Sequence, residues 1–535
     1  MSIPYSKQNI HNSDFNIIKK TLKNEFLTGG IMVKNFETKI EKFIGTKFSI
    51  TMNSATSCLL AACYALKLKK NDNVWVTTNS FVSSANCANF FGAKLDFLDI
   101  DRNNYNIDLT KLELKLKTTK KKDLPKILII VHIGGYPCDL NKIYNLKKKY
   151  RFKIIEDASH AFGAEYNNKK IGSFVKSDVT VFSFHPVKII TTAEGGCCVT
   201  HSKILSDKLK RFRDNGIIRN VKTKKFYFKN YYEMPEPGLN LRLNDIQCAL
   251  GISQLDRIKK NLIYRKELAN YYFKKLIKIR LNLPFNDLGF SSSYHLFIIQ
   301  FIEGNKENYK KIMQFFYKNG IKINTHYFPI HLQPYYKKIK KFNLPESIDY
   351  YFKSFSIPLY YGLEKSKQDK VIEVIKKISE QKFLKKKNFC YLKKASQNDS
   401  KYVFDLQNKD LNRKFFFNNK KLIFNNHNKW FKEKLLDKNT FLHCIYEADK
   451  RCGFVGLHIV KKKTLVPSII VDKKFRKKGY AYDALFEAFN SDKFNGYKIL
   501  TYCNINNPSS IKLFQRLGFI ITKTAKNFIT LKRQN

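Results

Sequence analysis

The sequence predicts an α/β protein of more than one domain, built around a mainly parallel sheet that helices cover. From about residue 48 to 200, short apolar runs alternate with helical patterns. Three of these runs, 127–132, 153–156 and 180–183, are too apolar for a strand with one exposed face, so we expect them to be buried strands. The chain of 535 residues is also too long for one ordinary core, which indicates two or three domains.

The other elements follow from the spacing of apolar residues. Residues 48–52 predict a strand, and residues 54–66 predict a helix with one face formed by Leu59, Leu60, Cys63 and Leu66. A helix is predicted over 239–255, followed by a lysine-rich helical stretch that ends near residue 279. Residues 290–377 mix strand and helix patterns, which is typical of a second, smaller domain.

A third unit is predicted after a lysine-rich connection at 376–387. It begins with a strand at 389–392 and a helix from Asp399, and a strand at 465–471 leads through a basic turn into another helix. One face of that helix is formed by Ala481, Ala484, Leu485, Ala488 and Phe489. The domains we expect are 1–250 (large), 251–383 (small) and 388–535 (C-terminal).

The net charge of +55, from 99 Lys and Arg against 44 Asp and Glu, raises nucleic acid or an anionic membrane as partners. The charge is spread in short lysine runs, which favours ordinary solvated faces, so we expect no nucleic-acid partner. No apolar run approaches the ~18 residues that span a bilayer, and residues 1–12 lack a signal-peptide pattern. The 11 cysteines show no zinc spacing, so we expect a cytoplasmic protein without a metal site or membrane insertion.

Two residues carry the first chemical signal. Asp157 ends the apolar run at 153–156, and Lys188 lies between the apolar segments 181–184 and 189–190, which should partly desolvate its amine and lower its pKa. Pyridoxal phosphate requires such a pair, a lysine for its Schiff base and a buried carboxylate for its ring nitrogen. The alternative for Asp157 alone is a turn or helix cap.

Motifs that occur in a fixed order extend this signal over residues 5–380. They are Leu27-Thr28-Gly29, Asn53 to Ser57, Ser80 to Ser83, Glu156-Asp157-Ala158, Gly172-Ser173, Ser183 to Lys188, Glu194-Gly195-Gly196 and Asn240-Leu241-Arg242. The chain thereby resembles the sugar aminotransferases of the DegT/DnrJ/EryC1/StrS family. The resemblance implies the aspartate-aminotransferase-like fold, with a large domain on a mainly parallel sheet and a small α/β domain.

The resemblance also implies roles for individual residues, with Lys188 as the catalytic residue. The cofactor contacts that it implies are Ala55, Thr56 and Ser183 for the phosphate, Phe81 stacked on the ring, Asp157 at the ring nitrogen, His160 near the ring hydroxyl, and Asn240 from the other subunit of a homodimer. Simpler roles exist for two of them, since Phe81 suits a core position and Asn240 suits a helix cap.

Within the family, two segments indicate the substrate. The segment 185–188 (HPVK) and the segment 326–336 (HYFPIHLQPYY) resemble the members that aminate carbon 4 in the pseudaminic acid pathway. This resemblance implies a UDP-linked 4-keto-6-deoxy sugar with a 2-acetamido group, glutamate as amino donor, and His326 and His331 as substrate contacts. Members that dehydrate carry histidine in place of Lys188, so transamination is indicated. A bacillosamine- or legionaminic-type sugar stays an alternative.

The C-terminal unit carries a second motif. Residues 476–481 (RKKGYA) follow a strand and open a helix, where backbone amides can hold a pyrophosphate. With 506–510 and 517–519, this turn resembles the GNAT acyltransferases over 388–535, which implies a GNAT α/β domain that uses acetyl-CoA. The contacts implied are Arg476, Lys478, Gly479, Ala481 and Asn507.

Two departures affect this second site. Phe514 stands where many GNAT relatives have a tyrosine that protonates the leaving thiolate, and the strand 465–471 has no acidic residue to act as base. Tyr502, His458 and solvent are open alternatives. Together the two halves predict consecutive steps, amination of a sugar and N-acetylation of the new amine. A cofactor-binding regulatory protein without catalysis and a nucleic-acid binder are the rival hypotheses.

Overall fold

The computed structural model describes residues 2–219, 231–284, 289–384, 390–461 and 463–533. It separates into two compact units. The first comprises Met1–Asn270, Gly289–Gln300 and Gly304–Val374, and the second comprises Tyr271–Leu288, Phe301–Glu303 and Ile375–Asn535.

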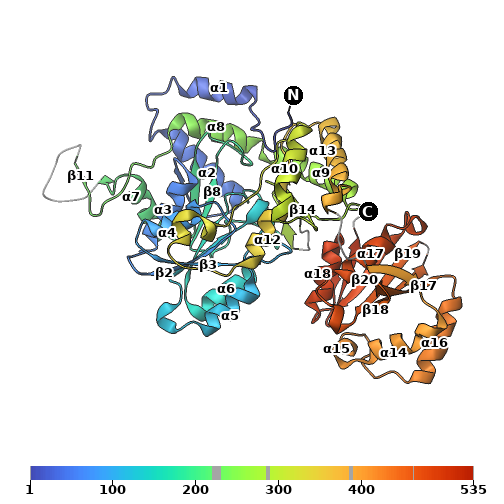
Figure 1. Cartoon of the computed structure of the whole chain (residues 1–535). Helices are drawn as coiled ribbons and strands as arrows, with labels where there is room; N and C mark the ends of the chain where they lie inside the picture. Colours follow the sequence, from blue (N-terminus) through green and yellow to red (C-terminus); the bar gives the residue numbers. More distant parts are fainter. Residues whose placement is uncertain (1, 220–230, 285–288, 385–389, 462, 534–535) are drawn as a thin grey trace. The chain divides into compact units, whose positions relative to one another are not determined.

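A seven-stranded sheet forms the centre of the first unit (Figure 1). Its strands, in spatial order, are β1 (Phe48–Met52), β9 (Gly196–Thr200), β8 (Val179–Ser183), β5 (Lys153–Asp157), β4 (Ile127–Val131), β2 (Asn73–Thr77) and β3 (Lys94–Leu98). Only β9 runs antiparallel to its neighbours, β1 and β8, and the other pairs are parallel. The predicted mainly parallel sheet is confirmed, and the three most apolar runs are its adjacent middle strands.

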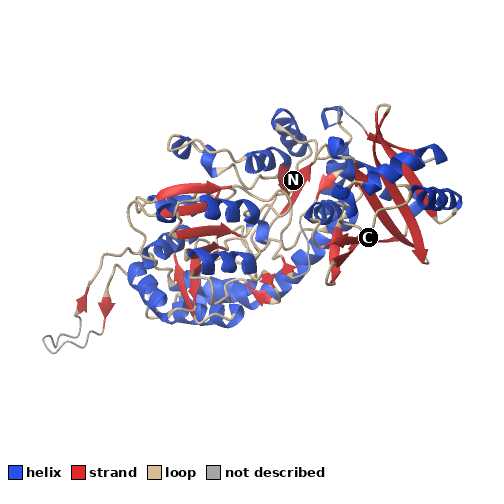
Figure 2. Cartoon of the chain, turned by 90° about the horizontal axis from the view of Figure 1, so that it is seen from below, coloured by secondary structure: helices blue, strands red, loops and turns tan. Residues whose placement is uncertain are grey.

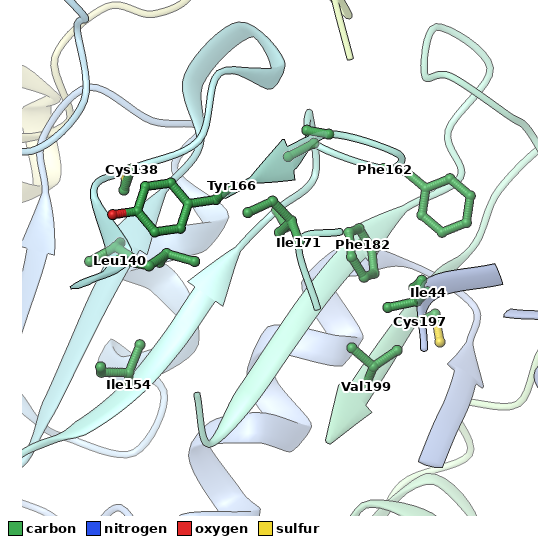
Figure 3. Close-up of a cluster of buried hydrophobic side chains, with 14 of the residues drawn as sticks. Ile44, Cys138, Leu140, Ile154, Phe162, Tyr166, Ile171, Phe182, Cys197 and Val199 are labelled. Carbon is green, nitrogen blue, oxygen red and sulfur yellow. The ribbon is translucent and has the colours of Figure 1, made fainter. Parts of the chain in front are cut away.

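Helices cover both faces of this sheet (Figure 2). Those around it are α2 (Ile31–Ile44), α3 (Ala55–Ala65), α4 (Ser83–Asn89), α5 (Leu109–Thr118), α6 (Leu140–Tyr150), α7 (Lys203–Arg213) and α8 (Asp245–Asp256). Successive residues of β4 belong to two different hydrophobic clusters, because side chains alternate between the two faces of a strand. Leu128 and Ile130 belong to the cluster that contains residues of α2, α5 and α6. Ile127 and Ile129 belong to the cluster that contains residues of α3 and α7. Figure 3 shows the first cluster, where Leu140 lies beside Tyr166.

The predicted start of the helix at residue 239 is wrong. Helix α8 begins at Asp245, because the side chain of Asn244 accepts a hydrogen bond from the N–H of Gln247 and caps the helix, and Gln247 completes a capping box. Residues 239–244 are therefore left outside the helix, although their leucines are spaced as a helix would need. The lysine-rich helix that follows is confirmed as α9 (Ile258–Leu276).

The rest of the first unit consists of short strands and helices. Strand β14 (Phe297–Phe301) pairs antiparallel with β15 (Ser354–Ile357), and β6 (Glu165–Tyr166) pairs with β7 (Lys169–Lys170) and β13 (Phe290–Ser291). The helices are α1 (Asn12–Thr21), α10 (Lys306–Lys318), α11 (Pro334–Lys337), α12 (Pro345–Lys353) and α13 (Lys365–Ser379). This mixture of strands and helices over 290–377 agrees with the sequence pattern.

The second unit has its own seven-stranded sheet. In spatial order its strands are β16 (Cys390–Lys394), β17 (Thr440–Glu447), β18 (Lys450–Lys461), β19 (Thr464–Val471), β20 (Lys498–Asn504), β22 (Phe528–Arg533) and β21 (Phe519–Thr524). Only β19 and β20 are parallel, and they pair at just two positions, Thr464 with Lys498 and Leu465 with Ile499. The two strands therefore part after a short shared segment.

Helices complete the second unit. They are α14 (Ser400–Asn408), α15 (Asp410–Arg413), α16 (Phe424–Leu436), α17 (Tyr480–Phe489) and α18 (Pro508–Arg516). Of the predicted connection 376–387, residues 376–379 continue helix α13, whereas residues 385–387, and Phe389 of the predicted strand, lie outside the described residues. None of the described helices is both long enough and apolar enough to cross a membrane.

Candidate active site

Functional side chains gather where the central strands of the first sheet end. Asp157 is the last residue of β5 and Ser183 the last of β8, and these two strands are parallel neighbours. Side chains at the carboxyl ends of such strands face one crevice. Asp157 is 5% exposed and Ser183 is 8% exposed, so both lie largely out of water.

The carboxylate of Asp157 is held by one hydroxyl group and one backbone N–H. The Ser84 hydroxyl donates to its Oδ2 over 2.5 Å, and the N–H of Ser159 donates to its Oδ1 over 3.2 Å. Because the Ser84 proton is used in this way, the 2.6 Å contact between Ser80 and Ser84 has Ser80 as donor. Each carboxylate oxygen keeps a further lone pair, so Asp157 can accept the protonated ring nitrogen of a pyridine.

Lys188 lies in the same crevice with a perturbed amine. Burial lowers its pKa to about 8, while the negative charge of Asp157 opposes the shift. The positive charge of Lys188 in turn helps to lower the pKa of His160 and His326, after burial as the main cause. The predicted residues Asp157, His160, Lys188 and His326 are thus close enough to interact, and the expected lowering of the lysine pKa is confirmed.

The start of helix α3 suits an anion. Ser54 caps the helix through a hydrogen bond from the N–H of Ser57, so the amides of Ala55 and Thr56 stand in its first turn. Gly196 of β9 lies directly beside this turn, because a Cβ there would come within 2.6 Å of the Ala55 nitrogen. Glycine at this position therefore lets the strand approach the helix end.

Phe81 and His160 both lie close to Tyr327, a residue for which the sequence predicted no role. Phe81 is 56% exposed, which leaves a ring face free for stacking, and its ring lies 6.0 Å from that of Tyr327. His160 contacts the Tyr327 hydroxyl through Nε2 at 2.9 Å. Tyr327 lies inside the segment 326–336, which resembles the members that aminate carbon 4, and Ser84 directly follows the motif at 80–83.

The predicted substrate contacts are both buried. Nδ1 of His326 is 2.7 Å from the Ser356 hydroxyl, and Nδ1 of His331 is 2.7 Å from the Thr78 hydroxyl. Nε2 of His331 is buried and has no hydrogen-bond partner among the described residues. Asn240 is exposed and precedes helix α8, whose cap is Asn244, so the structure removes the helix-cap alternative for Asn240.

In the second unit, the basic turn has the backbone of an anion-binding loop. Lys477 has φ +65° and Gly479 has φ +88°, and the turn opens the ten-residue helix α17, with Ala481 in its first turn. Nε of Arg476 donates to the carbonyl of Val471 over 3.0 Å, and Nζ of Lys478 lies 3.2 Å from Glu447. These contacts fix the direction of both cations.

The remaining residues of the second site divide into core and surface. Phe514 is 2% exposed and packs on Phe519, with ring centroids 5.1 Å apart, so it belongs to the core. Asn507 caps α18 through a 3.2 Å hydrogen bond from the N–H of Ser510. Tyr502 is exposed, and Nδ1 of His458 lies 3.3 Å from the Thr440 hydroxyl, while burial lowers the His458 pKa.

A lysine of lowered pKa beside a held, buried carboxylate and a helix N-terminus fits pyridoxal phosphate, and together with this sheet defines an enzyme of the aspartate-aminotransferase-like class. The model of the DegT/DnrJ/EryC1/StrS aminotransferase family matches residues 8–376, so the chain belongs to that family. Residues 404–519 match the acetyltransferase (GNAT) family. The chain is thus a pyridoxal-phosphate-dependent sugar aminotransferase with a C-terminal GNAT domain.

Individual relatives agree with this assignment. Over 397 residues, which make up 72% of this chain and 100% of the relative, the chain is 36% identical to the UDP-4-amino-4,6-dideoxy-N-acetyl-beta-L-altrosamine transaminase of Campylobacter jejuni subsp. jejuni serotype O:23/36 (strain 81-176). The Helicobacter pylori (strain ATCC 700392 / 26695) protein of the same name is 33% identical over 365 residues, 67% of this chain and 93% of the relative.

A solved structure gives the same picture. Helicobacter pylori PseC, an aminotransferase involved in the biosynthesis of pseudoaminic acid, superposes with a TM-score of 0.63 at 30% identity, covering 71% of this chain and 100% of that chain. The predicted aspartate-aminotransferase-like fold followed by a GNAT domain is therefore confirmed.

Proposed function

We propose that this chain aminates carbon 4 of a UDP-linked 4-keto-6-deoxy sugar with a 2-acetamido group, with glutamate as donor, and then acetylates the new amine with acetyl-CoA. The observation that carries the first step is the Lys188 amine, with a pKa of about 8, beside the held carboxylate of Asp157. The sugar is proposed from the relatives, two of which are named as transaminases of a UDP-linked 4-amino-4,6-dideoxy sugar.

Bound pyridoxal phosphate would supply the electron sink that lets the carbon bonded to the transferred amino nitrogen lose a proton. The residues of this chain would do the rest. Nζ of Lys188 would carry the proton between carbon atoms, because near neutral pH an amine with a pKa of about 8 can both give and take one. Asp157 would keep the ring nitrogen protonated, and Ser84 would hold the carboxylate in place. The amides of Ala55 and Thr56, with the Ser183 hydroxyl, would hold the phosphate.

We also propose a homodimer in which Asn240 reaches the phosphate of the other subunit. Its exposure and its place outside helix α8 support this role. His326 and His331 are proposed to contact the sugar, and the unpartnered Nε2 of His331 supports a polar ligand on that side. The domain divisions at 1–250, 251–383 and 388–535, and a cytoplasmic location, stay predictions.

For the second step, the turn at 476–479 and helix α17 are proposed to hold the pyrophosphate of acetyl-CoA, with Ala481 and Asn507 as further contacts. The left-handed conformation of Gly479 and the ten-residue helix that follows support this. Because Phe514 is a core residue without an ionisable group, the proton for the leaving thiolate would come from Tyr502, His458 or solvent.

The experiment is a product analysis of the purified chain with glutamate, acetyl-CoA and a panel of UDP-4-keto sugars, using mass spectrometry and NMR. We expect a 4-acetamido product, and we expect Lys188→Ala to abolish the amination. The same variant should still acetylate a 4-amino sugar that is supplied directly, which separates the two steps. Normal amination by Lys188→Ala would disprove the role of Lys188 in the amination step. If neither the wild-type chain nor Lys188→Ala acetylates the supplied 4-amino sugar, the proposed acetylation step is disproved.

The panel also distinguishes the rivals. Turnover of a bacillosamine- or legionaminic-type intermediate in place of the proposed sugar would keep the chemistry and change the substrate. If no sugar is turned over, a regulatory protein without catalysis would be favoured. The lowered pKa of Lys188 beside the held carboxylate of Asp157 argues against that alternative. A nucleic-acid binder would retain DNA or RNA near physiological salt, where we expect negligible binding.

A further inference from the structure

A chain of hydrogen bonds in the second unit fixes the proton of His458. The Asp437 carboxylate accepts hydrogen bonds from Nζ of Lys434 and from the N–H of Asn439, each over 2.9 Å. These contacts hold the Asp437 pKa below its ordinary value, so the group is ionised and can only accept. The Thr440 hydroxyl donates its single proton to Oδ2 of this carboxylate over 2.8 Å. The 3.3 Å contact between Thr440 and Nδ1 of His458 therefore has the histidine as donor.

Nε2 of His458 consequently carries no proton while the ring is neutral. Burial, followed by the charge of Lys434, lowers the His458 pKa, and the charge of Asp437 opposes this shift. The residues that face His458 from the neighbouring strands, Thr440 in β17 and Val466 in β19, are uncharged. The ring is therefore neutral near pH 7, and Nε2 can accept a proton.

The bare nitrogen lies beside Gly456. A Cβ at Gly456 would come within 3.0 Å of His458 Nε2 and within 2.8 Å of the Ser468 hydroxyl oxygen, so both polar atoms border the place that this glycine leaves without a side chain. Ser468 is exposed and His458 is half-buried, so a ligand can reach this place from solvent. Nε2 forms no hydrogen bond with any residue that the structure describes.

These residues lie where the two parallel strands of the second sheet part. Gly456 pairs with Ser468 across β18 and β19, and Ser468 comes after Leu465, the last residue of β19 that pairs with β20. The turn at 476–479, proposed to hold the pyrophosphate of acetyl-CoA, follows the far end of β19. The thioester is at the other end of that molecule, so a donor laid along β19 would direct it toward His458.

We propose that His458 is the general base of the acetyl transfer, with Ser468 as a contact of the acceptor amine. Thr440 and Asp437 are positioning residues that act through His458. The inference rests on the proposed function, because it requires acetyl-CoA and a 4-amino sugar in the second unit. It also removes His458 from the candidates for the acid, since a bare Nε2 has no proton to give.

The proposed step balances as follows. A bond forms between the sugar amine nitrogen and the acetyl carbon, and the bond from that carbon to the sulfur of coenzyme A breaks. The nitrogen loses a proton to Nε2 of His458, which later returns it to solvent. The leaving thiolate takes a proton from Tyr502 or from solvent.

Variants of the full chain test the base by acetylation of a supplied 4-amino sugar. A general base contributes about 10²–10⁴-fold, so His458→Gln should lower kcat about 100-fold or more and leave the Kd for acetyl-CoA unchanged. Thr440→Val should lower kcat by a smaller factor, and Thr440→Ser, which keeps the hydroxyl, should restore it. Acetylation at the normal rate by His458→Gln would overturn the proposal.

Gly456→Ala tests the place of the amine. Its Cβ would enter the space that Nε2 of His458 and the Ser468 hydroxyl border, so we expect a higher KM for the sugar and an unchanged Kd for acetyl-CoA. An unchanged KM would mean that the amine binds elsewhere, which would overturn the proposal.

Nitrogen NMR of the chain labelled with ¹⁵N-histidine gives a readout that needs no turnover. The signals of His458, assigned by their loss in His458→Gln, should show a proton on Nδ1 and a pKa below the ordinary ~6.5. Asp437→Asn should lower this pKa, and Lys434→Gln should raise it, because the two charges act on the ring in opposite directions. A proton on Nε2 of the neutral ring, or shifts in one direction, would overturn the relay.

His427→Gln is the matched control. It removes another buried histidine of the second unit, one that packs on Phe431, so it should lower the unfolding temperature and leave kcat unchanged. An equal loss of kcat in this control would mean that His458 acts only through structure. If the wild-type chain does not acetylate, the proposed second step fails; if it does and His458→Gln acetylates normally, only this inference fails.

Discussion

The hydroxyl of Ser84, which lies near the start of helix α4, donates a 2.5 Å hydrogen bond to Oδ2 of Asp157. This contact joins an element on the face of the sheet to the carboxylate at the end of β5. The chain of hydrogen bonds includes one further serine, since the Ser80 hydroxyl donates to the Ser84 hydroxyl over 2.6 Å. The position of the carboxylate, on which the cofactor depends, is thus set by two serines in the segment 80–84 together with the N–H of Ser159.

Replacing Ser84 with alanine should weaken cofactor binding. A hydrogen bond to a charged group contributes about 1.5–3 kcal/mol, so we expect the Kd for pyridoxal phosphate to rise about tenfold or more, measured by absorbance titration. Ser80→Ala should have a smaller effect, because Ser80 reaches Asp157 only through Ser84. Equal effects of the two variants would contradict this account.

The pKa of Lys188 predicts how the cofactor-free protein captures pyridoxal phosphate. Only the neutral amine attacks an aldehyde, and the amine is neutral above its pKa of about 8. The capture rate should therefore rise with pH and level off above about pH 8, whereas the rate for an ordinary lysine would level off only above pH ~10.4. Stopped-flow absorbance gives this profile.

Asp157→Asn provides the matching control on this titration. The negative charge of Asp157 raises the Lys188 pKa against the effect of burial, so its removal should move the midpoint of the capture profile below that of the wild type. A midpoint that stays in place, or moves upward, would show that the two groups do not interact as the structure has them.

Gly196→Ala should destabilise the first unit. The new Cβ would lie 2.6 Å from the nitrogen of Ala55, so β9 and the start of α3 would have to separate. We expect a loss of about 1–3 kcal/mol in the free energy of unfolding, measured by denaturant titration, together with weaker binding of inorganic phosphate. An unchanged unfolding midpoint would show that the two segments lie further apart than they do in the structure.

Phe514→Tyr should not supply the missing acid of the acetyltransferase domain. Phe514 is 2% exposed and packs on Phe519, so a tyrosine hydroxyl would be buried among apolar groups. We expect lower stability, by about 1–3 kcal/mol, and no gain in the acetylation rate of a supplied 4-amino sugar. A clear gain in that rate would mean that residue 514 reaches the cofactor thiol.

Much of the fold could be predicted because burial leaves a direct trace in sequence. The strands at 127–131, 153–157 and 179–183 are covered on both faces, which requires continuous apolar runs. The start of α8 could not be found in this way, because the leucines at 239–243 keep a helical spacing in a non-helical segment, and the local capping box at Asn244 decides the boundary.

The site was predictable only in part. Lys188 and Asp157 stand out by apolar neighbours and family motifs. The contact between His160 and Tyr327 depends on how the His160 ring is turned, and the backbone N–H of Gly134 holds that ring through Nδ1, a contact that no pattern in the sequence reveals. In the same way, Ser84 contacts Asp157 only because helix α4 packs beside the end of β5.

The most direct test of the account is to find the lysine that carries the cofactor. The purified protein, loaded with pyridoxal phosphate, is reduced with borohydride to make the bond to lysine permanent, and its peptides are mapped by mass spectrometry. We predict the pyridoxyl-phosphate mass on Lys188, and its loss in Lys188→Ala. The chain contains many other lysines, so labelling of a different lysine, or of none, would contradict the central claim.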